Sequence, residues 1–124
     1  DAGEASTILG LQSFGQGVDL PGAYCETVLI AKLPFVPPTD PVGQARAEWL
    51  RKRGRDPFEE LVVPAVGVKM TQWTGRLIRS NTDTGNIICY DRRLIDAGFG
   101  RQIRKGLPPY ATFTRRSGVI APAA

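Results

Sequence analysis

Three short apolar runs, each bounded by turn residues, stand out along the chain. They span Thr7–Leu11, Thr27–Ala31 and Asn86–Tyr90. Nearly continuous apolar runs of this length are typical of strands that are covered on both faces, as in a parallel sheet flanked by helices. We therefore expect three strands at these positions.

Helices are predicted between and after these runs. Asp40 is a good N-cap, Pro41 suits the first helical position, and Gly54 ends a helix over 41–53. Three more helices are expected: one from Pro64 to about Ser80, one over 92–97 stopped by Gly98, and one over 100–105 ending at Gly106. This alternation predicts an α/β domain with a mainly parallel sheet.

The ends of the chain carry less pattern. Residues 111–124 show no periodicity, which predicts a domain over 1–110 followed by a disordered tail. Three strands are few for such a sheet, and the first begins within ten residues of a start that lacks methionine. We therefore expect a piece of a longer polypeptide, truncated on its N-terminal side. An exposed sheet edge or apolar face that promotes self-association would follow.

Composition narrows the chemistry. The net charge of +4 favours anionic partners, although a solvated basic surface explains it equally well. The absence of histidine excludes Ser-His-Asp and Cys-His catalysis and histidine metal sites. Two cysteines, expected as free thiols, cannot hold a four-thiolate cluster. No apolar run approaches the roughly 20 residues that span a bilayer, and no metal site is predicted.

The helix expected from Pro64 carries two stripes. Val66, Met70, Trp73 and Leu77 share one face and are predicted to be core. On the other face, Gln72, Arg76 and Arg79 fall within about 60° of one another. Gly75 would cost about 1 kcal/mol inside a helix, which favours a role in the close approach of a ligand. Two forked guanidiniums suit a polyphosphate, whereas an ordinary solvated face is the alternative.

A glycine-rich loop over 12–22 follows the first apolar run. Gly15, Gly17 and Gly22 allow backbone N–H groups to turn toward an anion, although a plain turn is the simpler interpretation. Leu20 in place of a third glycine excludes a dinucleotide fingerprint. No lysine follows a glycine anywhere, so the G-x-x-x-x-G-K-[ST] phosphate loop is absent. If the arginines act on a nucleotide, another domain must hold it.

These runs resemble superfamily 2 helicases of the DinG/XPD branch, the bacterial DinG and YoaA-like enzymes more closely than eukaryotic XPD. Gln72-x-x-Gly75-Arg76-x-x-Arg79 resembles motif VI, and Ser13-Phe14-Gly15-Gln16-Gly17-Val18-Asp19 resembles motif V. Gly15 and Gln16 replace the usual tryptophan or alanine and glutamate. The resemblance covers about residues 8–109, through Lys32-Leu33-Pro34-Phe35, Pro38-x-Asp40-Pro41, Asp83-x-Gly85, Asp91-x-Arg93 and Leu107-Pro108.

The resemblance implies the C-terminal RecA-like lobe of a cytoplasmic, ATP-dependent DNA helicase. Its partners would be single-stranded DNA and the N-terminal lobe of the same parent chain, which would bind ATP and Mg²⁺ and carry an iron–sulfur cluster. Arg79 would be the arginine finger, with Arg76 beside it. Gln72, Gly75, Asp19 and Gly17 would serve the nucleotide, and Ser13, Gln16, Lys32 and Phe35 the DNA.

A plainer interpretation gives Phe35 to the core, Lys32 to solvent and Asp19 to a turn. A non-catalytic nucleic-acid-binding or protein-interaction module with a helicase-like fold is the alternative function.

Overall fold

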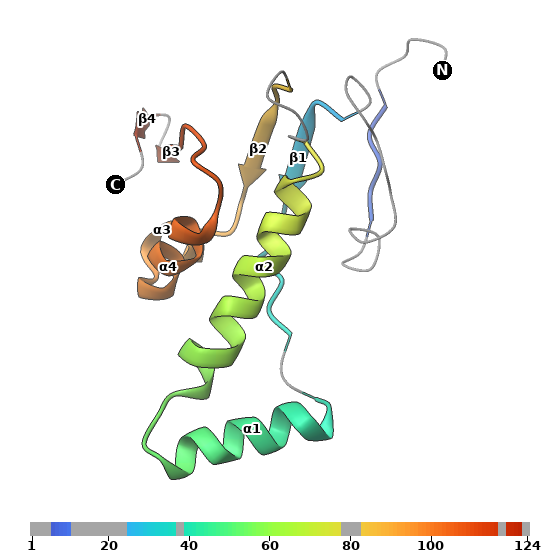
Figure 1. Cartoon of the computed structure of the whole chain (residues 1–124). Helices are drawn as coiled ribbons and strands as arrows, with labels where there is room; N and C mark the ends of the chain where they lie inside the picture. The colour runs from blue at the N-terminus through green and yellow to red at the C-terminus, as the bar shows by residue number, and fades with distance from the viewer. Residues whose placement is uncertain (1–5, 11–24, 37–38, 78–82, 117–118, 123–124) are drawn as a thin grey trace.

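Two parallel strands and a long helix across one of their faces form the centre of the protein (Figure 1). The computed structural model describes residues 6–10, 25–36, 39–77, 83–116 and 119–122. The elements along the chain are β1 (Thr27–Ile30), α1 (Pro41–Lys52), the π-helical turn η3 (Phe58–Val62), α2 (Val63–Thr74), β2 (Asn86–Cys89), α3 (Arg93–Asp96), α4 (Gly98–Gly106), β3 (Phe113–Arg116) and β4 (Val119–Pro122).

The β1–β2 pair confirms two of the three predicted strands. Their register runs from Thr27 opposite Asn86 to Ile30 opposite Cys89. Alternate residues of each strand face α2, because successive side chains of a strand point to opposite faces. The other face carries Leu29 and Ile88, which are 54% and 42% exposed and which the register places side by side. An exposed apolar face was expected; self-association through it stays a prediction.

The third predicted strand is not found in its described part. Residues 6–10 form no strand, and Leu9 is 90% exposed; Leu11 lies outside the described residues. An apolar run becomes a strand only where another strand supplies hydrogen bonds and a core covers one face.

The α1 helix forms as predicted. The Asp40 carboxylate accepts a hydrogen bond from the Gly43 N–H at 2.7 Å, which satisfies one of the free N–H groups of the first turn. Gly54, just past the helix, has a φ of +70°, a left-handed conformation that other residues adopt at a cost.

The α2 helix buries the predicted apolar stripe. Met70 is fully buried, Val66 is 1% exposed, and both pack with Ile30, Leu33 and Ile103. Trp73 packs against this core, and Leu77, after the helix, is 4% exposed. Only the length was wrong, because α2 ends at Thr74 instead of Ser80.

Gly75 explains where α2 ends. It is the C-cap, and its N–H donates to the Thr71 carbonyl at 2.8 Å. The next two N–H groups, of Arg76 and Leu77, reach back only three residues, to Trp73 and Thr74. This tightening is common at helix ends. Gly75 therefore terminates the helix, which corrects the prediction that it lies inside one.

The other helix boundaries need one correction. Gly98 was expected to stop the helix over 92–97, but it is the first residue of α4. The break between α3 and α4 comes from Ala97, whose backbone is extended with φ −87° and ψ 146°. Gly100 then lies so close to α3 that a Cβ would sit 2.3 Å from the Leu94 carbonyl oxygen.

The segment after Tyr110 differs from the expected disordered tail. It contains β3 and β4, which pair antiparallel from Phe113 opposite Pro122 to Arg116 opposite Val119. The β3 segment is mostly polar and β4 ends in a proline, so neither gave the turn-bounded apolar run on which β1 and β2 were predicted. The domain boundary at 110 stays a prediction.

Gly85 is a sharp test of this packing. A Cβ on Gly85 would lie 2.6 Å from the Leu77 Cδ1 and 2.7 Å from the Glu26 carbonyl oxygen. Gly85→Ala should therefore lower the free energy of unfolding by about 1–3 kcal/mol. The matched control is Gly67→Ala inside α2, where a Cβ meets no atom within 4 Å. It should stabilise by about 0.5–1 kcal/mol. Urea unfolding of both variants measures this, and equal effects would contradict the packing.

Candidate nucleotide and nucleic-acid sites

The structure describes half of the residues that the sequence assigns to function. Gln72, Gly75, Arg76, Lys32 and Phe35 are described. The other five, which are Arg79, Asp19, Gly17, Ser13 and Gln16, lie outside the described residues.

The motif that starts at Gln72 occupies the end of α2. Gln72 is exposed in the last turn of the helix and borders a shallow hollow between α2 and α4, together with Thr71 and Gln102. Arg76 is half-buried in the turn after Gly75. The expectation that Gln72 and Arg76 share one regular helical face was therefore wrong, because the helix ends between them.

The residues after α2 return to the amino edge of the sheet, where both parallel strands begin. Leu77 packs against Gly85, the residue before β2. The Glu26 carbonyl, just before β1, accepts a hydrogen bond from the Asn86 N–H at 2.9 Å. The chain that leaves the Arg76 motif and the chain that enters β1 thus meet at the same edge.

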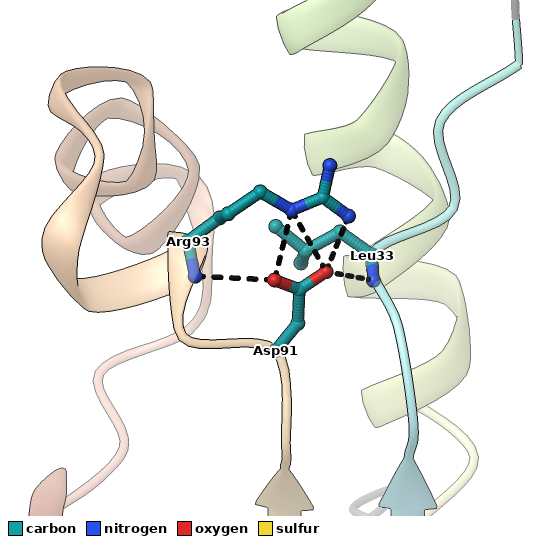
Figure 2. Close-up of polar contacts among 3 residues, drawn as sticks. All are labelled: Leu33, Asp91 and Arg93. Atoms are coloured by element: carbon teal, nitrogen blue, oxygen red, sulfur yellow. Dashed lines mark hydrogen bonds and ion pairs between the residues drawn. The ribbon is translucent and has the colours of Figure 1, made fainter.

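At the opposite, carboxyl edge, where both strands end, a cluster of hydrogen-bonded polar groups is centred on Asp91 (Figure 2). One carboxylate oxygen of Asp91, Oδ2, accepts the Leu33 N–H at 2.9 Å and the Arg93 Nη2 at 2.6 Å. The other, Oδ1, accepts the Arg93 backbone N–H at 3.1 Å and its Nε at 2.9 Å. A single carboxylate therefore joins the loop after β1 to the segment after β2.

These contacts decide the ionisation of Asp91. The Arg93 guanidinium lowers the pKa of the Asp91 carboxyl group far below its ordinary value of 3.8, and the two backbone N–H groups lower it further. Partial burial opposes this shift but does not outweigh it. The Asp91 side chain is 7% exposed and that of Arg93 is 52% exposed. Asp91 is thus an anion at neutral pH, whose charge holds the two segments together.

An aromatic cluster lies between the loop after β1 and the core. The Phe35 ring stacks on Phe58 at 5.8 Å between centroids and meets Phe99 edge-on at 5.4 Å. The Arg93 guanidinium carbon lies 4.9 Å from the Phe35 centroid, at a distance where the ring face attracts a cation. Phe35 therefore packs against the core, whereas Lys32 is exposed.

Among the described candidates, Arg76 is therefore not brought together with Lys32 and Phe35. Phe58, just before α2, contacts the loop beyond the carboxyl edge, whereas Leu77, just after α2, lies at the amino edge. The twelve residues of α2 span about 18 Å between them. Sequence reasoning gave no site role to Asp91 and Arg93, although two charged residues directly after a strand mark the ligand-binding edge of an open α/β sheet.

Three other features limit the chemistry. Cys25 and Cys89 are free, as expected, and both are half-buried. Burial raises the pKa of the Cys89 thiol, which disfavours a reactive thiolate. Within the described ranges, no group of three or more Cys, Asp or Glu side chains can hold a metal ion, and none of the described helices is long and apolar enough to cross a membrane.

Comparison with known proteins agrees with this architecture. Residues 1–110 match the family model described as the helicase C-terminal domain. The chain belongs to this family. The small parallel sheet with its helices is that of a helicase C-terminal, RecA-like lobe, as expected from the sequence.

Several relatives of this helicase C-terminal domain are DinG proteins. The chain is 39% identical over 109 residues to the ATP-dependent DNA helicase DinG of Photobacterium profundum, which covers 88% of the chain and 16% of that protein. It is 39% identical over 108 residues to the protein of that name from Escherichia coli, covering 87% of the chain and 15% of the relative. It is 43% identical over 101 residues to the 3′-5′ exonuclease DinG of Bacillus subtilis, covering 82% of the chain and 11% of the relative. The chain thus spans about a sixth or less of each relative.

The Asp91 cluster makes the stability of this domain depend on pH. The folded-state pKa of Asp91 is lowered, so its stabilisation is present above the unfolded pKa of about 3.8 and is lost as the pH falls below it. Asp91→Asn should lower the free energy of unfolding at pH 7, and the deficit should shrink below pH 3.8. Urea unfolding between pH 7 and pH 2.5 measures this. Asp96→Asn, which removes an exposed ion pair with Arg92, is the control; a deficit of Asp91→Asn that is independent of pH would contradict the assignment.

Proposed function

We propose that this domain is the C-terminal motor lobe of an ATP-dependent DNA helicase of the DinG type. The observation that carries the proposal is the run Gln72-x-x-Gly75-Arg76-x-x-Arg79 at the end of α2, in a chain that belongs to the helicase C-terminal domain family. The relatives from Photobacterium profundum and Escherichia coli, named ATP-dependent DNA helicases, support it. The parent acts in the cytoplasm.

Arg79 is the arginine finger of this proposal. Its guanidinium donates to the oxygens of the γ-phosphate, where negative charge gathers as the terminal phosphoryl group is transferred to water. Arg76 lies beside it, on a phosphate or on an acidic group of the other lobe, and Gln72 orients the site from the last turn of α2. The helix ends at Gly75, so Arg76 follows on a turn instead of a regular helical face.

The triphosphate and Mg²⁺ are held by the N-terminal lobe of the parent. This chain has no phosphate loop of its own. Bound Mg²⁺ supplies charge neutralisation at the phosphates, and an iron–sulfur cluster belongs to the same parent lobe. From this chain, Asp19 and Gly17 approach the nucleotide. The order along the chain supports their role, because the segment that bears them precedes β1 as the Arg76 motif precedes β2.

Single-stranded DNA is the second ligand. Ser13, Gln16 and the Lys32–Phe35 loop are its proposed contacts. Lys32 is exposed and forms no ion pair with any described residue, so its ammonium is available to a backbone phosphate. The Phe35 ring is engaged with Phe58 and Phe99; it supports the loop from beneath.

Arg79→Ala in the parent enzyme tests the finger. The arginine acts on charge that develops in the transition state, so its loss should lower kcat far more than ATP affinity. Arginine fingers contribute about 10³–10⁵ in rate. Arg79→Lys should restore little, because an ammonium lacks the forked geometry. Steady-state phosphate release and nucleotide binding separate the two effects.

The exposed Arg101 of α4 provides the control, and Arg101→Ala should leave turnover unchanged. Strand separation and strand degradation are scored independently, because the Bacillus subtilis relative is named an exonuclease. Near-normal turnover of Arg79→Ala would remove the finger from Arg79.

Measurements on the isolated 124-residue chain distinguish a motor lobe from a stand-alone binding module. The isolated chain should hydrolyse no ATP and should bind single-stranded DNA weakly, with an affinity that falls steeply as salt rises. Phosphate-release assays and fluorescence anisotropy between 50 and 300 mM salt, roughly the range over which counterion release is resolved, measure both. Tight binding that is insensitive to salt would favour the non-catalytic module.

A further inference from the structure

The loop after β1 is held in place by residues far away in the sequence. The Leu33 N–H donates to the Asp91 carboxylate across a separation of 58 residues. The Leu33 side chain is 4% exposed, within the core beneath α2. Two residues further on, Phe35 lies under the Arg93 guanidinium. The loop is therefore attached at its backbone, at one apolar side chain and at one aromatic ring.

Lys32 directly precedes these attachments and is exposed. The β1 ladder ends two residues earlier, where the Tyr90 N–H donates to the Ile30 carbonyl at 2.9 Å. Lys32 thus lies between a strand end and a clamped residue, which limits the directions in which its side chain can extend. The neighbouring cations are already paired, Arg92 with Asp96 at 3.2 Å and Arg93 with Asp91.

We propose that Asp91 and Arg93 are positioning residues for nucleic-acid binding, which hold the Lys32–Phe35 loop so that Lys32 meets a backbone phosphate of a single strand. This inference rests on the proposed function. Neither Asp91 nor the paired face of Arg93 needs to touch the strand. Their effect is to fix the loop before the strand arrives, so that binding does not pay the entropy of ordering it.

The geometry explains why these two residue types are needed. A carboxylate can accept the Leu33 N–H and the Arg93 fork at the same time, because it has two oxygens with several lone pairs. An asparagine in its place would turn an NH₂ group toward the guanidinium or lose the bond to Leu33. Arg93 combines the fork with a flat face over Phe35, which a lysine does not reproduce.

A double-mutant cycle in the full-length parent enzyme tests the proposal. Affinity for a fluorescent oligothymidylate is measured without nucleotide for wild type, Lys32→Ala, Asp91→Asn and the double variant. At low salt Lys32→Ala should weaken binding about tenfold, as for a lost hydrogen bond to a charged group. It should also reduce the slope of log affinity against log salt by about 0.7. Asp91→Asn should weaken binding about five- to tenfold in wild type, but less than about twofold when Lys32 is already alanine.

Arg93→Lys is a more conservative variant than Asp91→Asn, because it keeps a positive charge beside Asp91. It should give an affinity for DNA between those of wild type and Asp91→Asn. Lys52→Ala, which removes another exposed lysine, paired with Glu48 on α1, should stay within about twofold of wild type. The rate of ATP hydrolysis at saturating DNA should be unchanged in Asp91→Asn, while the DNA concentration for half-maximal stimulation rises.

Three outcomes would overturn the positioning role. Equal losses from Asp91→Asn in both backgrounds would make Asp91 a purely structural residue. A lowered hydrolysis rate at saturating DNA would give it another function. Undiminished binding by Lys32→Ala would remove the phosphate contact itself. Failure of the proposed function would be seen differently, as wild-type protein without DNA-stimulated ATP hydrolysis, and the binding cycle is independent of that result.

Discussion

The parallel pairing of β1 with β2 determines at which edge of the sheet the segments next to these strands lie. Parallel strands place their starts at one edge and their ends at the other. The register Thr27–Asn86 to Ile30–Cys89 therefore assigns each flanking segment to an edge. The described part of the Arg76 motif lies before β2, whereas the Lys32 loop and the Asp91 cluster follow β1 and β2. The separation of Arg76 from Lys32 thus follows from strand direction together with the length of α2.

The apolar stripe of α2 turns this ladder into a domain. Two four-residue strands do not form a stable sheet alone in water. Met70, Val63 and Val66 bury one face of the pair, and Ile103 of α4 completes the core. The Asp91 carboxylate and the three phenylalanine rings then close the carboxyl edge, where no backbone pairing remains.

Features set by neighbours in the sequence could be predicted, whereas features set by distant residues could not. The Asp40 cap, the Gly54 end of α1 and the Met70 stripe depend on residues within about a turn or two of one another. The end of α2 was not predicted, because a glycine in a periodic pattern suits both a helix interior and a helix end. Which of the two forms depends on the burial of Leu77 against Gly85, a residue that follows later in the chain. Residues 7–10 of the first apolar run form no strand, and no other described segment pairs with them.

The candidate site divides in the same way. Gln72, Arg76 and Arg79 could be selected by residue type and spacing, because all three lie within one short segment of the sequence. The link between Asp91 and Leu33 joins residues 58 positions apart, and no periodicity encodes a pair at that distance. The cluster of Phe35, Phe58 and Phe99 likewise unites three separate segments. The sequence therefore allowed residues with distinctive chemistry to be selected, but it did not predict the contacts that Asp91 and Arg93 make with Leu33 and Phe35.

The end of α2 at Gly75 also affects how the two edges of the sheet are connected. A helix that continued from Thr74 to Ser80 would extend about 9 Å further along its axis. Ending at Thr74, the chain instead turns back, so that Leu77 packs on Gly85 beside Glu26. At its other end α2 is joined through η3 to Phe58 and hence to Phe35. One buried helix thus connects the turn that bears Arg76 to the loop that bears Lys32. Because its core face is closely packed with β1, β2 and α4, this helix fixes the spacing between the two edges.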